Sequence, residues 1–178
     1  GVLTSNNDYG NIHFVGRILS ALFDIGTIFL LFKIGQKIFN EKIGLLAAFF
    51  YSIMVLPIQL SHFFAVDTFL NFFLVLSFYL LILLFSSSSS FLLSLPLGIS
   101  FGLALACKIS ALYFLPIIGL GYLRLLFSFK KLKHFRFFSS GIIFALFAIF
   151  TFRLAQPTAF SSGNLLNWKL NPQFIANL

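Results

Sequence analysis

The stretch 66-VDTFLNFFLVLSFYLLILLF-85 holds 20 residues and a single charged side chain, the Asp67 carboxylate. A helix needs about 20 apolar residues to cross the hydrocarbon core of a membrane, within a workable range of roughly 17 to 25. This stretch therefore predicts a membrane-spanning helix that begins beside an acid.

Other stretches of similar length and polarity lie on both sides of it. The predicted spans are approximately 14–35, 43–60, 66–85, 91–107, 110–128 and 137–153. Short polar breaks separate them, as helical hairpins require, because unpaired backbone is not tolerated in lipid. We predict an all-α, polytopic transmembrane bundle of six helices over 14–153, with extracytoplasmic segments at 1–13 and 154–178.

The composition excludes several other classes of protein. Apolar residues make up 60% of the 178 residues and charged residues 9%, too few to cover a soluble domain of this size. The net charge of +8 is scattered between apolar runs, without a basic stripe, which argues against a nucleic-acid partner. Cys107 stands alone in an apolar run, so neither a disulfide framework nor a cysteine metal site is expected.

The basic residues indicate the orientation. Eight of them follow the first span or lie between the fifth and sixth, at Lys33, Lys37, Lys42, Arg124, Lys130, Lys131, Lys133 and Arg136. Six alternating spans put both groups on one side, which the positive-inside rule assigns to the cytoplasm. The opposite face then carries Arg17, Lys108, Arg153 and Lys169.

The first span carries polar residues along one helical face. Arg17, Ser20 and Asp24 are spaced i, i+3 and i+7, so they form a stripe that runs into the membrane. A charge near mid-bilayer costs at least about 2.5–3.5 kcal/mol, so Asp24 should face protein and be paired or protonated. A packing contact between helices is the preferred interpretation of Asp24. Arg17 either snorkels to the surface or belongs to a site.

A short turn between the second and third spans carries His62 and Asp67. Asp67 either caps the following helix, where its charge suits the helix dipole, or is a site carboxylate that orients a sugar hydroxyl or a basic residue. A triad of Ser61, His62 and Asp67 is disfavoured, because sequence neighbours rarely form one.

Three cations from different spans, Arg17, Lys108 and Arg153, are predicted to reach the same outer face. Snorkelling explains any one of them. Together they favour a site for an anionic headgroup, because ammonium and guanidinium groups form strong charge-assisted hydrogen bonds to phosphate.

Short motifs run through nearly the whole chain in a characteristic order. They are Val15-Gly16-Arg17, Leu19-Ser20-Ala21, Ile34-Gly35, Gly44-Leu45-Leu46-Ala47-Ala48, Gln59-Leu60-Ser61-His62, Asp67-Thr68-Phe69-Leu70, Gly102-Leu103-Ala104-Leu105-Ala106, Lys108-Ile109-Ser110-Ala111, Arg153 with Gln156-Pro157, and Leu170-Asn171-Pro172. In these motifs the chain resembles the dolichyl-phosphate-mannose–protein mannosyltransferase family. It is most similar to the family's prokaryotic relatives, the phospholipid-carrier-dependent glycosyltransferases.

The resemblance implies a GT-C fold in a prokaryotic plasma membrane, with an outward-facing site. Such enzymes move a sugar from a polyprenyl-phosphate carrier to an acceptor, a protein or a glycolipid, and no other cofactor or metal is implied. We predict substrate-binding roles for six residues on this face, Arg17, His62, Asp67, Lys108, Arg153 and Gln156.

The family's catalytic base lies in an acidic motif of the first outer loop, and the chain begins at what resembles the family's second span. Asp8 lacks the family's Asp-Glu pair and is not nominated as the base. We therefore expect an internal fragment, inactive by itself, whose base lies upstream.

Two other functions fit a polytopic chain. A transporter or lipid flippase also needs intramembrane charges, but typically places them at the midplane on broken helices or between repeats. Here the charges other than Asp24 gather at the faces, and no repeat is evident. A noncatalytic scaffold would not require the outer cations.

Overall fold

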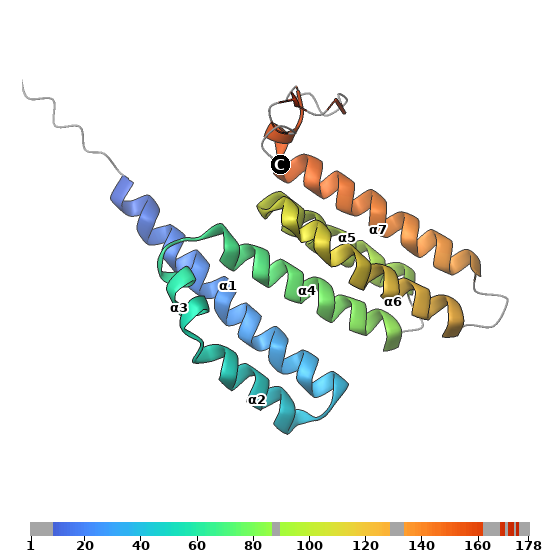
Figure 1. Cartoon of the computed structure of the whole chain (residues 1–178), viewed down its shortest axis with the longest axis horizontal. Helices are drawn as coiled ribbons and strands as arrows, with labels where there is room; N and C mark the ends of the chain where they lie inside the picture. The colour runs from blue at the N-terminus through green and yellow to red at the C-terminus, as the bar shows by residue number, and fades with distance from the viewer. Residues whose placement is uncertain are drawn as a thin grey trace, which may run out of the picture. The chain divides into compact units, whose positions relative to one another are not determined.

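The computed structural model describes residues 9–86, 90–128, 134–161, 168–169, 171–172 and 174 (Figure 1). The elements are α1 (Tyr9–Ile38), α2 (Glu41–Ser52), α3 (Val55–His62), α4 (Val66–Ser86), α5 (Ser90–Cys107), the 3-10 helix η1 (Ile109–Phe114), α6 (Leu115–Ser128), α7 (His134–Ala155) and the 3-10 turn η3 (Pro157–Ala159). The predicted all-α class is confirmed.

The predicted spans all coincide with helices, but the helices differ in how well they fit a membrane. Among the described residues, three helices are long and apolar enough to cross one, at Phe14–Ile38, Val66–Phe85 and Phe138–Ala155. The α2–α3 pair makes a fourth if it is counted as one span. The apolar parts of α5 and of η1 with α6, Leu92–Cys107 and Ile109–Arg124, are shorter. The described residues therefore supply three or four spans by length, where the sequence predicted six.

The second predicted span, 43–60, is not one continuous helix as expected. It is broken after Ser52 into α2 and α3, which meet at an angle of 57°. Pro57 supplies the reason, because in an unbroken helix its ring would clash with the carbonyl of Ile53, four residues earlier. The break lies at Ile53 and Met54, directly before the helix that contains the proline.

The turn after α3 lies later than the sequence indicated. Ser61 and His62 belong to α3, and the turn itself is Phe63 to Ala65. Phe64 adopts a left-handed φ of 53°, which is rare for a bulky residue. Its ring covers Gly16 of α1, where an added Cβ would come within 2.6 Å of the ring. The absence of a side chain at Gly16 therefore lets this turn rest on α1.

The chain forms two compact units, residues 1–72 and 73–178, with the boundary inside α4. In the first unit α1 and α2 form an antiparallel hairpin whose backbones touch at two glycines. A Cβ on Gly35 would lie 2.6 Å from the Cα of Gly44. The side-chain oxygen of Asn40 caps α2 by accepting from the Ile43 amide at 2.9 Å.

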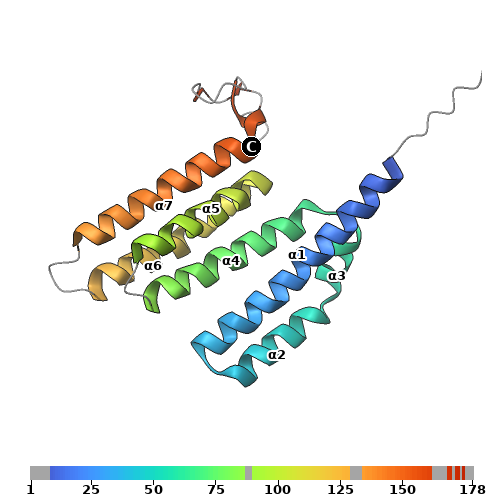
Figure 2. The same ribbon diagram turned by 180° about the vertical axis from the view of Figure 1, so that it is seen from behind.

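The second unit is organised around the parallel pair α5 and α7, which lie side by side (Figure 1 and Figure 2). The hydroxyls of Ser94 and Ser140 are hydrogen-bonded, and the partners are 46 positions apart in sequence. The same offset of 46 positions recurs one turn and two turns later along α5. A Cβ on Gly98 would lie 2.6 Å from the Phe144 carbonyl oxygen, and one on Gly102 would lie 2.6 Å from that of Ala148. Small residues allow this close approach, which is how helices associate in lipid.

The core of the second unit is apolar and lies around this pair. It consists of Leu81, Leu84, Leu97, Phe101, Ile118, Tyr122, Phe144 and Ala148. Tyr122, near the end of α6, donates from Oη to the Ser94 hydroxyl at 3.0 Å, near the start of α5. The end of α6 therefore lies beside the start of α5, so α6 runs antiparallel to α5 and α7.

We predict that Gly98→Ala and Gly102→Ala each destabilise the protein by about 1–3 kcal/mol, because each new methyl group collides with the α7 backbone. Thermal unfolding in detergent measures the loss. The control is Gly119→Ala in α6, where an added Cβ meets nothing within 4 Å. This change should be neutral or stabilising, since alanine is the better helix former. Equal effects at the three glycines would contradict the close α5–α7 contact.

Candidate functional site

The first unit contains a polar cavity of about 300 Å³. Its polar wall comes from three helices, with Asp24 on α1, Tyr51 on α2, and Asp67, Thr68 and Asn71 on α4. The apolar wall comes from the α2–α3 break and from α3, and consists of Met54, Leu56, Pro57 and Leu60. The proline that breaks the helix therefore also lines the cavity.

A chain of hydrogen bonds joins the polar wall. Tyr51 Oη donates to Asp24 Oδ1 at 2.9 Å, and Asn71 Nδ2 donates to the same Tyr51 oxygen at 2.8 Å. Tyr51 thus links α1 to α4, and the three side chains are half-buried. This is the pairing with protein that the sequence predicted for Asp24, because an isolated carboxylate is costly in a membrane.

Asp67 and Asn71 are one turn apart on α4, at i and i+4, and so share a helical face. Asp67 is not the cap residue of α4, as one interpretation had it, but lies within its first turn. A carboxylate there is still favoured by the helix dipole. Asp67 therefore both stabilises the start of α4 and lines the cavity.

Thr68 differs from the other polar lining residues. Its side chain is 5% exposed, and its Oγ1 has no hydrogen-bond partner in the part of the chain that the structure describes. A buried hydroxyl without a partner costs about 1–3 kcal/mol. Ser20 on α1 is in the same state within the described ranges, but it does not line the cavity.

Arg17 and His62, both predicted site residues, lie on exposed surfaces of the first unit. Arg17 is on α1, and His62 is the last residue of α3. Neither of them is among the described residues that line the cavity. Asp8 lies outside the described residues.

Lys108, Arg153 and Gln156 lie at one end of the second unit. Lys108 is exposed and precedes η1, directly after α5 ends. Arg153 is in the last turn of the parallel helix α7, and the offset between the helices places it opposite Cys107. Gln156 follows α7 and is half-buried, with its backbone N–H bonded to the Phe152 carbonyl at 2.9 Å.

The Arg153 side chain is not at the surface, where the sequence suggested it. It is 1% exposed, and its guanidinium carbon lies 4.1 Å from the centroid of the Phe160 ring. This is a cation–π contact, which a guanidinium over an aromatic ring makes well. The segment after α7 therefore folds back over the arginine, which sequence hydropathy could not show.

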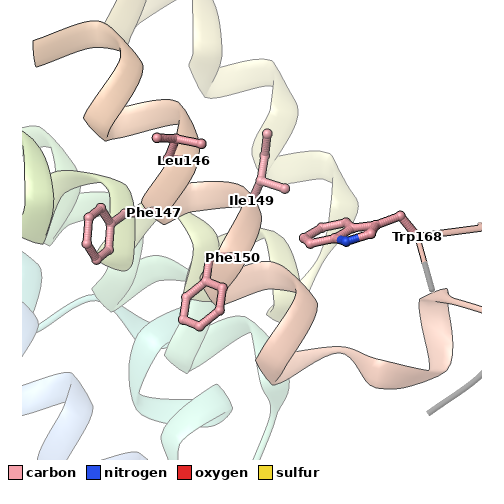
Figure 3. A pocket seen from close by; sticks show the side chains of 5 residues that line it. All are labelled: Leu146, Phe147, Ile149, Phe150 and Trp168. Carbon is pink, nitrogen blue, oxygen red and sulfur yellow. The ribbon is translucent and has the colours of Figure 1, made fainter. Parts of the chain in front are cut away.

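An apolar pocket of about 360 Å³ lies farther along α7, lined by Leu146, Phe147, Ile149, Phe150 and Trp168 (Figure 3). The Trp168 ring faces the α7 side chains from the segment that follows η3. It also meets Phe160 edge-on, with ring centroids 6.0 Å apart. Aromatic rings thus connect the pocket to Arg153.

Sequence reasoning did not nominate Tyr51, Thr68 or Asn71. Asn71 could have been found, because its spacing from Asp67 places two polar side chains on one face of an apolar helix. Tyr51 could not, because it lies 27 positions from Asp24 and within another predicted span.

Comparison with known proteins settles the family. The sequence profile named dolichyl-phosphate-mannose-protein mannosyltransferase matches residues 9–154. The chain belongs to this family. Neither a curated protein nor a solved structure matches it significantly. The resemblance seen in the motifs is thereby confirmed, and the family is one of membrane glycosyltransferases of the GT-C type.

We predict that Tyr51→Phe destabilises the first unit by about 1–3 kcal/mol, because it leaves the Asp24 carboxylate and the Asn71 amide without their shared partner. Chemical denaturation in detergent measures the change. Tyr113→Phe is the matched control, since Tyr113 is 86% exposed, and it should change stability little. Equal stabilities of the two variants would contradict a structural role for the hydrogen-bond chain.

Proposed function

We propose that this mannosyltransferase-family chain is part of an enzyme that moves a sugar from a polyprenyl-phosphate carrier to an acceptor on the extracytoplasmic face. The observation that carries the proposal is the placement of Lys108 and Arg153 at the same end of the parallel pair α5 and α7. Two cations from different helices suit the phosphate of such a carrier, which leaves as an anion when the sugar is transferred.

The two cations differ in what they can contribute. Lys108 is exposed and supplies a compact point charge, so it is the first contact for an arriving headgroup. Arg153 is buried, so its charge acts in a low dielectric, where it stabilises a developing anion more strongly. A phosphate can touch the face of Arg153 that Phe160 covers only if that ring moves aside.

We predict that Lys108→Ala and Arg153→Ala each slow sugar transfer in the complete enzyme by about 10²–10³, the range for loss of one transition-state donor. Release of polyprenyl phosphate from a short-chain polyprenyl-phosphate sugar measures the rate. Arg153→Lys keeps the positive charge but removes the planar, two-pronged arrangement of guanidinium donors. It should restore only part of the rate that Arg153→Ala loses.

The matched control for this prediction is Arg124→Ala. Arg124 also makes a cation–π contact, with its guanidinium carbon 5.5 Å from the Phe85 centroid, but it lies near the end of α6, at the opposite end of the unit. Its removal should change the rate little. Equal small losses at the three positions would mean that the outer cations only snorkel, and the phosphate site would be wrong.

The orientation is tested by labelling. In a Cys107→Ser background, a thiol introduced by Ser110→Cys beside Lys108 should react with an impermeant maleimide added to intact cells. One introduced by Leu123→Cys, at the opposite end of the unit, should react only after permeabilisation. Both positions are exposed. Labelling in the reverse order would place the Lys108 end in the cytoplasm and contradict the proposed extracytoplasmic site.

A further inference from the structure

The cavity of the first unit has a charge opposite to that of the Lys108 end. Two of its nine lining residues, Asp24 and Asp67, are acids, and none of the nine is a base. A phosphate in this cavity would face two carboxylates, and none of the nine lining residues would offer it a positive charge. We propose, resting on the proposed transferase function, that the cavity binds a single uncharged sugar ring, carried by the donor or by the acceptor.

The size of the cavity fits one ring. Its volume of about 300 Å³ is at the lower end of the range for ligand pockets. A longer oligosaccharide would have to extend out of the cavity.

The lining has the two surfaces that a sugar ring requires. Carboxylates accept strong hydrogen bonds from hydroxyl groups, and Asp24 and Asp67 offer such acceptors from two different helices. Met54, Pro57 and Leu60 provide an apolar wall for the C–H face of a ring. The bonds of Tyr51 to Asp24 and Asn71 hold two of the polar groups in place before a ligand arrives.

Thr68 points independently to a ligand with hydroxyl groups. It lines the cavity, is more than nine-tenths buried, and its Oγ1 lacks a hydrogen-bond partner among the described residues. A ligand hydroxyl in the cavity would supply the missing partner. The cost of the orphaned hydroxyl in the empty protein would then be recovered on binding.

A metal ion fits the cavity less well than a sugar. The described residues contain no group of three or more His, Cys, Asp or Glu side chains that could hold a metal ion. Hard cations such as Ca²⁺ take six to eight oxygen ligands, whereas the cavity offers two carboxylates with the neutral groups of Tyr51, Thr68 and Asn71, and the rest of its lining is apolar.

The test uses ligand-observed saturation-transfer NMR on the 178-residue chain in nanodiscs, with methyl mannoside, methyl glucoside and methyl galactoside as probes. Saturable binding of at least one glycoside is expected. Thr68→Val and Asp67→Asn should each weaken it by about tenfold, the effect of losing one good hydrogen bond. No saturable binding of any of the three would overturn the proposal.

Two controls separate a site from a folding effect. Ser20→Ala also removes a buried hydroxyl that has no partner among the described residues, but away from the cavity. Glu41→Gln also neutralises an acid in the first turn of a helix, again outside the cavity. Both should bind the glycoside as the unaltered chain does. The Thr68→Val variant should unfold at the same temperature as the unaltered chain or at a higher one, because the substitution removes an unsatisfied hydroxyl group. Equal losses of binding in Thr68→Val and Ser20→Ala would overturn the cavity as the site.

Binding of lipids in the complete enzyme distinguishes the two sources of the ring. If the cavity holds the donor's sugar, Thr68→Val weakens binding of a polyprenyl-phosphate sugar but not of polyprenyl phosphate. If it holds the acceptor's sugar, both lipids bind normally while transfer slows. Unchanged glycoside binding in Thr68→Val, together with a large loss of transfer in Lys108→Ala, would refute the cavity and leave the proposed function standing. The reverse pattern would refute the phosphate site at Lys108 and leave the cavity standing.

Discussion

Hydrocarbon offers no hydrogen bonds, and this constraint shapes the described structure throughout. Backbone groups are satisfied within helices, and polar side chains on those helices must find partners in protein. Tyr51 meets this need for both Asp24 and Asn71. In the second unit the Ser94 and Ser140 hydroxyls satisfy each other across α5 and α7. Tyr51, Ser94 and Ser140 are therefore points where helices are joined.

Small residues determine how closely the helices can approach. Gly35 against Gly44 brings α1 to α2, and Gly98 and Gly102 let α5 lie on the α7 backbone. Without a hydrophobic driving force between helices in lipid, such close packing supplies much of the association energy. The close α5–α7 contact also sets their parallel register. That register brings Lys108 and Arg153 to one end, so the candidate phosphate site depends on glycines earlier in α5.

Each of the two units gathers side chains of one charge at its candidate site. Acids line the cavity of the first unit, and Lys108 and Arg153 lie at one end of the second. Carboxylates repel a phosphate but accept hydrogen bonds from hydroxyl groups. Lysine and arginine side chains attract a phosphate and donate hydrogen bonds to it. The helix break at Pro57 matters here, because it provides one wall of the acid-lined cavity.

The sequence by itself determined the helical class, the approximate helix positions, the family and the need of Asp24 for a partner. These follow from local properties, since the length and polarity of a stretch decide whether it can cross a membrane. Only the tertiary structure decided that Tyr51 is the partner and that Phe160 covers Arg153. Hydropathy cannot tell which face of an apolar helix contacts another helix. The register between two helices decides which side chains become hydrogen-bond or packing partners. That register depends on close contacts between residues distant in sequence.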